Sequence, residues 1–141
     1  MVAEKGKMLL ETVAPSRQVV RSEHVDEVIA PGSEGQFGVL PGHTPFLTTL
    51  TVGELSYREG SEWHHLAVEW GYAEVGADRV IILAEGADRA ADIDLAAARE
   101  AKERAERVLA EKAGEPDYEK ARVELMRAMI RIQVAEKHGQ K

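Results

Sequence analysis

The five histidines of this sequence have side chains that could bind a metal or transfer a proton, but their spacing forms no recognisable motif. They are His24, His43, His64, His65 and His138. No two of them follow the His-x-x-x-His or His-Glu-x-x-His pattern. His64 and His65 are adjacent, and adjacent residues of a β-strand point to opposite faces, so we expect them not to share a metal ion. The spacing predicts no metal site.

Motifs for nucleophilic catalysis and phosphate binding are also unsupported. The chain has no cysteine. Ser33 lies in Gly32-Ser33-Glu34-Gly35, which lacks the Gly-x-Ser-x-Gly spacing of a nucleophile elbow. The glycine-rich stretch that contains it has neither a P-loop nor a dinucleotide-binding pattern, and no carboxylate pair can be singled out as acid and base. We therefore expect no catalytic residue and a chain that is not an enzyme by itself.

Residues 30–45 carry an unusual density of residues that direct the backbone. Four glycines and three prolines fall within this stretch. Pro31-Gly32 and Pro41-Gly42 predict turns, because proline presets φ at the second turn position and glycine accepts positive φ at the third. The apolar segment 37–40 between them predicts a short buried strand. A path specified so closely favours a packing role or a docking surface.

Composition and charge limit the class of protein. The chain has 141 residues, of which 44% are hydrophobic, and a net charge of -7. These values predict one ordinary domain, or a small domain with an appendage, and argue against nucleic acid or an anionic membrane as the main partner. No apolar run approaches the roughly 20 residues that cross a bilayer, and the N-terminus does not resemble a signal peptide. Residues 116–141, with four acidic and six basic residues, are the only net-basic segment. This segment is either a binding surface for acidic groups or a solvated face.

The first two thirds of the sequence predict an all-β sandwich or barrel. Short segments rich in β-branched and aromatic residues alternate with turn formers such as Val52-Gly53, Gly60-Ser61 and Trp70-Gly71, at the spacing of such folds. The predicted strands are 9–13, 19–21, 25–29, 47–50, 55–58, 63–68, 72–75 and 80–83.

The remainder predicts two helices. Residues 84–92 are expected to form a polar connector, and Asp94 to cap a helix from Leu95 to Glu111. Gly114 should end this helix and Pro116 begin a second one, to about His138. Its apolar stripe is expected at Tyr118, Ala121, Leu125, Ala128, Met129 and Ile132. The pattern predicts a β domain over residues 1–87, and a linker with a weakly held antiparallel helical hairpin over residues 88–141.

Several segments in order resemble the epsilon subunit of bacterial rotary, F-type ATP synthases. Residues 31–50 closely resemble that family's signature. Gly53-Glu54-Leu55 and residues 71–75 resemble its next landmarks, and residues 92–94 with 101–106 resemble the start of its C-terminal hairpin. The resemblance extends from about Met8 to Lys137.

The resemblance implies a non-catalytic part of a rotary machine. Family members form a β-sandwich at the foot of the central stalk, which binds the gamma subunit and the membrane c-ring and couples proton translocation to ATP synthesis. They are peripheral proteins on the cytoplasmic face of the bacterial plasma membrane. Ser33, Glu34, Gln36 and His43 match the region that faces the ring, although each could also be an ordinary exposed turn residue. The hairpin can inhibit ATP hydrolysis by contacting the alpha and beta subunits of the catalytic head, and Arg122, Arg127 and Arg131 are the implied contacts.

Some family members also bind ATP, through Ile/Leu-Asp-x-x-Arg-Ala and two arginines of the second helix. Here Ile93, Asp94 and Ala98 match, as do Arg127 and Arg131, but Ala97 replaces the motif arginine and Asp88 replaces a longer glutamate. Loss of a charge-assisted contact costs roughly 1.5–3 kcal/mol, so any ATP site should be weak or absent. No cofactor is expected to be required. The alternative function is an ATP-sensing binder whose hairpin closes on nucleotide.

Overall fold

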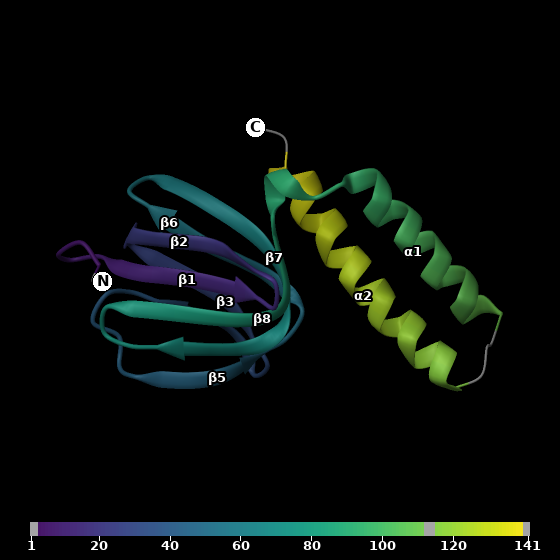
Figure 1. Ribbon diagram of the computed structural model, residues 1–141, viewed down its shortest axis with the longest axis horizontal. Coiled ribbons are helices and arrows are strands. Elements are labelled where there is room, and N and C mark those ends of the chain that lie inside the picture. Colours follow the sequence, from purple (N-terminus) through teal and green to yellow (C-terminus); the bar gives the residue numbers. More distant parts are fainter. Residues whose placement is uncertain (1–2, 112–114, 140–141) are drawn as a thin grey trace. The chain divides into compact units, whose positions relative to one another are not determined.

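The computed structural model describes residues 3–111 and 115–139, and it divides into two compact units (Figure 1). The first unit ends at Arg89 and the second begins at Ala90. Among the described residues, the first unit contains all the strands, and the second contains a short 3-10 turn and two helices. The predicted order of a β domain followed by helices is confirmed.

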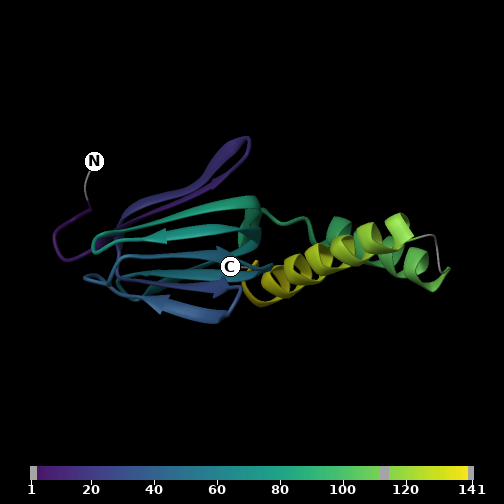
Figure 2. The same ribbon diagram turned by 90° about the horizontal axis from the view of Figure 1, so that it is seen from below.

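The first unit is an eight-stranded β-sandwich (Figure 2). Its strands follow the order β2-β1-β8-β7-β5-β3-β4, while β6 pairs with β3 and β7. Every pairing is antiparallel except that of β1 with β8. The strands are β1 (Met8–Ala14), β2 (Arg17–Val25), β3 (Glu27–Gly32), β4 (Gly35–Val39), β5 (Phe46–Leu50), β6 (Gly53–Glu59), β7 (Glu62–Val75) and β8 (Arg79–Arg89).

A single hydrophobic core fills this sandwich. It is built from inward-facing side chains of strands that lie far apart in the sequence, such as Leu10, Val28, Leu66 and Ile82, each at most 1% exposed. Asp26, between β2 and β3, connects the segment before β1 with the β6–β7 turn. Lys7 Nζ lies 2.6 Å from Asp26 Oδ1, and the Gly60 amide donates to Asp26 Oδ2. These contacts with Lys7 and Gly60 lower the pKa of the Asp26 carboxyl.

Strand β7 differs most from the sequence-based prediction. Two strands separated by a turn at Trp70-Gly71 were expected, but β7 runs unbroken from Glu62 to Val75. The positive φ values of Trp70 (37°) and Gly71 (143°) mark a kink within the strand. The pairing of β7 with β8 keeps one register across this kink, while the opposite edge of β7 pairs with β6 before the kink and with β5 after it. Hydrogen bonding to β8 therefore keeps one strand where local sequence favours a break.

Three other local predictions were wrong. Segment 25–29 is divided between β2 and β3 at Asp26. Pro31-Gly32 ends β3 rather than forming a turn, and the turn follows at Ser33 and Glu34, between paired Gly32 and Gly35. The connector expected from residue 84 is mostly strand, since β8 continues to Arg89 and a 3-10 turn covers Ala90–Asp92. Small and polar residues there remain in the ladder because β7 supplies their backbone partners.

The helical unit contains α1 (Leu95–Ala110) and α2 (Glu115–His138). Asp94 caps α1 as predicted, because its Oδ1 accepts from the Ala97 amide at 3.0 Å. The expected stop at Gly114 lies outside the described residues. The two helices pack against each other as an antiparallel pair (Figure 2), and Arg99 of α1 forms a 2.8 Å ion pair with Glu136 of α2.

The buried positions of the hairpin are mostly alanines. Ala98 and Ala105 are buried in α1, and Ala121, Ala128 and Ala135 in α2, where they repeat every seven residues. Tyr118 and Met129, expected on the buried stripe of α2, are 43% and 52% exposed. Alanine side chains have little apolar area to bury, so a weakly held hairpin stays an expectation.

Candidate functional site

Strand β4 forms an edge of the sandwich and lies within the glycine- and proline-rich stretch. It is the last strand of the sheet order, and β3 is its one partner among the described strands. Phe37 and Val39 face inward, opposite Ala30 and Val28. Gln36 and Gly38 alternate with them and are exposed. An edge strand with an open outer face presents unpaired backbone groups and is suited to docking.

Ser33 and Glu34 form the tight turn at the start of this edge. The Ser33 amide donates to the Thr49 carbonyl at 3.0 Å, and the Ser33 and Thr49 hydroxyls lie 2.6 Å apart. The turn is therefore held against the end of β5, while the Glu34 side chain is exposed. An added Cβ at Gly32 would lie 2.8 Å from the Gly35 carbonyl oxygen, which explains why glycine precedes the turn.

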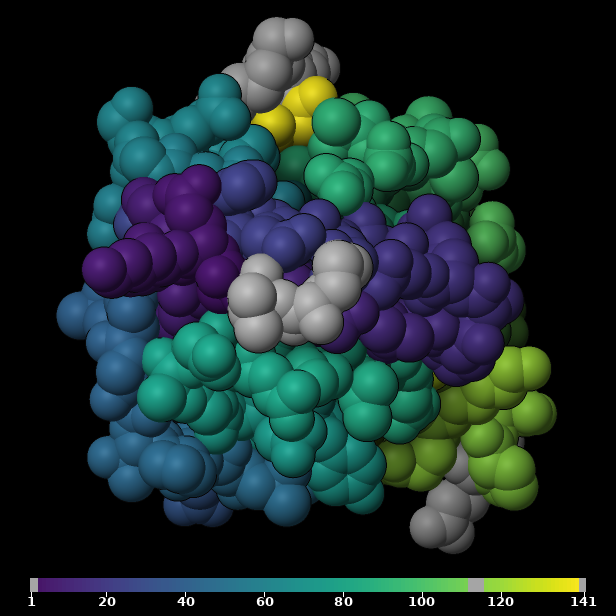
Figure 3. Space-filling model, turned by 60° about the vertical axis from the view of Figure 1, so that its left-hand side comes forward, coloured from purple at the N-terminus to yellow at the C-terminus, as the bar shows by residue number. Residues whose placement is uncertain are grey.

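His43 lies in the loop that follows β4. Gly42 has a φ of 89° and donates its amide to the Ala77 carbonyl at 2.6 Å, which confirms the predicted Pro41-Gly42 turn and holds the loop beside the β7–β8 turn (Figure 3, blue beside teal). His43 Nδ1 lies 2.6 Å from the Thr44 carbonyl oxygen. The His43 ring lies 6.2 Å from that of Phe46, which in turn meets Phe37 edge to face at 5.4 Å.

These four polar residues lie along one edge and do not form a compact cluster. Ser33 and Glu34 precede β4, Gln36 is on it, and His43 follows it. At about 3.3 Å per residue, the five residues of β4 separate the two ends by roughly 16 Å. The arrangement suits contact with an extended surface rather than capture of a small molecule.

Exposed apolar residues in the loop after β4 and on β5 were not predicted from the sequence. Leu40 is 55% exposed, Phe46 41% and Leu47 70%. Leu40 belongs to the segment expected to be a buried strand, and the expectation was wrong for this residue because β4 ends at Val39. Tyr72 and Leu83, paired across β7 and β8, are also more than half exposed. The alternation of side chains between the two faces of a strand could have indicated which positions face outward. It could not have indicated which faces lack a covering layer. Exposed apolar groups of this size are typical of interfaces.

The three arginines expected to make inhibitory contacts all lie on α2 but not on one face. Arg127 and Arg131 are four residues apart and share a face, and both are partly buried. Arg122 precedes Arg127 by five residues, which rotates it by about 140° around the helix. Its side chain is 53% exposed and pairs with Glu119 at 3.3 Å.

The residues expected to form a weak ATP site have structural contacts of their own. Asp88, in β8, forms a 3.0 Å ion pair with Arg17 of β2. Ile93 donates its amide to Ala90 at 3.3 Å, and Asp94 is the cap of α1. Ala97 is exposed in the first turn of α1, so no guanidinium is present at this position of the motif. These contacts explain Asp88 and Asp94 without a nucleotide.

No helix within residues 3–111 and 115–139 combines the length and the apolar character needed to span a bilayer.

Comparison with known proteins assigns this two-part architecture to a class of subunit. Residues 7–90 match the family model for the beta-sandwich domain of the ATP synthase Delta/Epsilon chain, and residues 91–136 match the model for its long alpha-helix domain. The fold is that of a chain in a Euglena gracilis mitochondrial ATP synthase assembly of OSCP, F1 and c-ring, with a TM-score of 0.79 and 22% identity over 94% of this chain and 82% of that one.

Closer relatives define the family. An ATP synthase epsilon chain of Syntrophotalea carbinolica is 56% identical over 94% of this chain and 96% of its own length. One from Syntrophobacter fumaroxidans is 52% identical over 96% and 99%, and one from Geobacter metallireducens 47% over 96% and 98%. The chain belongs to the family of bacterial ATP synthase epsilon chains, as the resemblance in its sequence indicated.

Proposed function

We propose that this chain is a non-catalytic rotor subunit of the central stalk, which couples proton translocation through the c-ring to ATP synthesis. Its partners would be the gamma subunit, the c-ring and the catalytic head, and it would be held peripherally at the cytoplasmic face of the plasma membrane. Support comes from the family membership of both units and from the structural neighbour, which was solved in an assembly with F1 and the c-ring. The candidate site is an extended edge that exposes both polar and apolar side chains, which suits a docking role.

The observation that carries the docking proposal is the open edge of β4. Gln36 and Gly38 face outward, and exposed Leu40 and half-buried His43 follow in the next loop. A rotor subunit needs a surface that transmits torque without large internal motion. An edge strand fixed at both ends, by Ser33 against Thr49 and by Gly42 against Ala77, provides such a surface. We assign the c-ring to this edge.

Photocrosslinking in the assembled complex tests this assignment. A photoreactive residue at Gln36 should crosslink to the c-ring, because this side chain points outward from the β4 edge. The matched control is Gln18, an exposed glutamine of β2 at the other end of the sheet order. We expect no ring crosslink from Gln18. Crosslinks to the ring from Gln18 but not from Gln36 would contradict the assignment, because they would show that the β2 edge and not the β4 edge faces the ring.

We further propose that the hairpin inhibits ATP hydrolysis. The net-basic second helix and the small size of the buried alanines between the two helices support this, since a weakly held hairpin could exchange its partners at modest cost. The acidic surfaces it would meet belong to the catalytic head. Arg127 and Arg131 can bind one such surface together, whereas Arg122 must face a different one or remain in solvent.

ATP sensing is the alternative proposal, supported by the shared face of Arg127 and Arg131. Isothermal titration of the isolated chain with MgATP should show weak binding or none, because Ala97 supplies no guanidinium. An Ala97→Arg variant should then bind about ten- to a hundredfold more tightly, the equivalent of one charge-assisted contact. Tight binding by the unmodified chain would instead favour the sensing function. If neither protein releases or absorbs heat on titration, the ATP-sensing proposal is wrong.

A further inference from the structure

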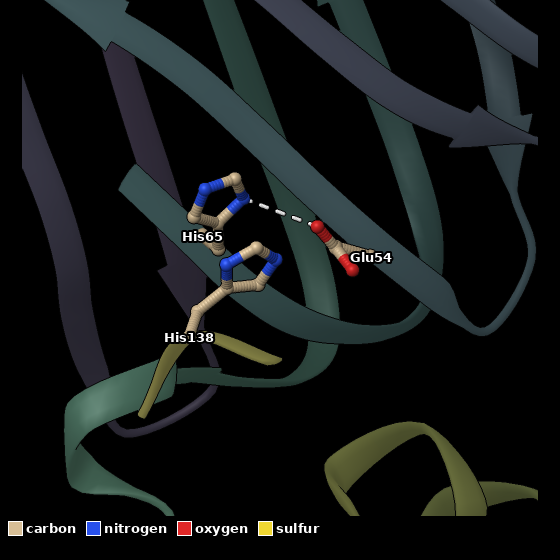
Figure 4. A group of neighbouring side chains, drawn as sticks. All are labelled: Glu54, His65 and His138. Carbon is tan, nitrogen blue, oxygen red and sulfur yellow. Dashed lines mark hydrogen bonds and ion pairs between the residues drawn. The ribbon is translucent and has the colours of Figure 1, made fainter. Parts of the chain in front are cut away.

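The tip of the β6–β7 hairpin brings together three side chains that can bind a metal. Gly60 and Ser61 form the turn, and the strand register places Glu59 opposite Glu62 and Tyr57 opposite His64. Residues two apart on a strand share a face, so these four side chains occupy the corners of one square on one face of the hairpin. His65 points to the other face, where its Nδ1 lies 3.1 Å from Glu54 Oε2 (Figure 4).

The potential ligand atoms at this tip lie close to one another. His64 Nε2 lies 3.0 Å from Glu59 Oε1 and 3.3 Å from Glu62 Oε1. One nitrogen and two carboxylate oxygens are all within 4.8 Å of one another. Zinc binds histidine nitrogen and carboxylate oxygen at about 2.0–2.2 Å, so ligand atoms on one zinc ion are separated by roughly 3–3.5 Å. The two distances from His64 Nε2 match this requirement before any movement.

Groups outside the cluster orient two of the three ligands. The Ser22 hydroxyl of β2 donates to Glu59 Oε2, the oxygen that does not face His64. The His64 ring stacks on Tyr57, with ring centres 4.8 Å apart and planes 26° apart. Tyr57 is itself 3% exposed and part of the core. Hydrogen bonding to a ligand's outer atom and fixed ring orientation are the supports that metal sites use to hold their ligands.

We propose that Glu59, Glu62 and His64 form a site for a divalent transition metal, with zinc as the best-fitting ion. The two carboxylates and a neutral imidazole supply two negative charges, which a divalent cation balances. Nitrogen and oxygen ligands together favour zinc over calcium or magnesium, which prefer oxygen alone. Glu62, whose side chain is 75% exposed, closes the outer side, and water completes the coordination. The ion would clamp the hairpin tip beside β2.

Calorimetric titration of the full chain with zinc tests the proposal. The chain carries no affinity tag, and the titration is done at neutral pH in a buffer that does not bind zinc. The variants are His64→Gln, Glu59→Gln and Glu62→Gln. The matched control is His24→Gln, because His24 is an exposed histidine with one carboxylate, Glu4, 3.0 Å from its ring nitrogen. The melting temperature of each protein with and without zinc is a second measurement, and circular dichroism verifies that each variant folds.

We expect His64→Gln to remove one zinc ion per chain and the zinc-dependent rise in melting temperature. Glu59→Gln should weaken the same binding at least tenfold, and Glu62→Gln should weaken it less because this side chain is the most exposed. His24→Gln should bind as the unmodified chain does. An unchanged number of bound zinc ions in folded His64→Gln, or no zinc binding by the unmodified chain, would overturn the proposal.

Discussion

A Gly71→Ala variant should lower the free energy of unfolding of the β-sandwich by about 3 kcal/mol or more. Gly71 has a φ of 143°, which residues other than glycine rarely adopt. An added Cβ would overlap the Leu83 carbonyl oxygen and lie 2.9 Å from Ala84 Cα. Because both obstacles are backbone atoms, β7 and β8 would have to separate locally and lose hydrogen bonds. The total free energy of unfolding of a native domain is only about 5–15 kcal/mol, so this is a large effect.

Urea unfolding followed by tryptophan fluorescence measures this change. Both tryptophans, Trp63 and Trp70, lie in β7, so their emission reports on the sandwich and not on the helical unit. Gly38→Ala is the matched control, because a Cβ there meets only the Val28 carbonyl oxygen at an ordinary 3.9 Å. It should change stability by no more than about 1 kcal/mol. Equal unfolding midpoints for Gly71→Ala and the unmodified chain would show that the kink tolerates a side chain.

Removal of residues 94–141 should raise ATP hydrolysis by the assembled complex about fivefold or more, if the hairpin inhibits with a coupling energy of ordinary size. The sandwich should remain bound, since its core is built from strands β1 to β8. Hydrolysis and the amount of bound subunit are measured on the same preparation. Unchanged hydrolysis with the truncated subunit still bound would rule out inhibition and leave the docking proposal standing.

Single charge reversals then identify the inhibitory face. Arg131→Glu should relieve part of the inhibition, because Arg131 shares its face with Arg127. Arg122→Glu, about 140° around the helix, is the comparison on the other face. Arg122 already pairs with Glu119, so its reversal also creates a like-charge pair three residues apart. Helix content by circular dichroism separates that local effect from a lost contact. Relief by Arg122→Glu alone would move the inhibitory surface to the opposite face.

The features predicted correctly from the sequence depend on local chemistry. Asp94 was expected to cap α1 and does so through its own carboxylate. The Pro41-Gly42 turn needs a positive φ that glycine supplies within the loop itself. The two helices follow from composition and capping over adjacent residues. The ordered landmarks between residues 8 and 137 identified the family, because they preserve residue types as well as spacing.

Partners that are distant in the sequence decided the other features. Trp70-Gly71 resembles a turn, but β8 pairs across it and keeps β7 continuous. Leu40 and Leu47 have apolar side chains typical of a core, yet both are exposed because no layer of the sandwich covers them. The histidines have no metal-binding spacing among themselves, and only the β6–β7 register places Glu59 and Glu62 beside His64.

The sequence by itself determined the family, the order of the two units, the helical hairpin and the stretch that forms the candidate docking edge. The tertiary structure alone decided that β4 is an edge strand, that apolar side chains in the following loop and on β5 are exposed, and that a histidine meets two carboxylates. The reason is physical. Turn and capping preferences act over a few residues, whereas sheet order and burial depend on which distant strands supply hydrogen bonds and cover each face.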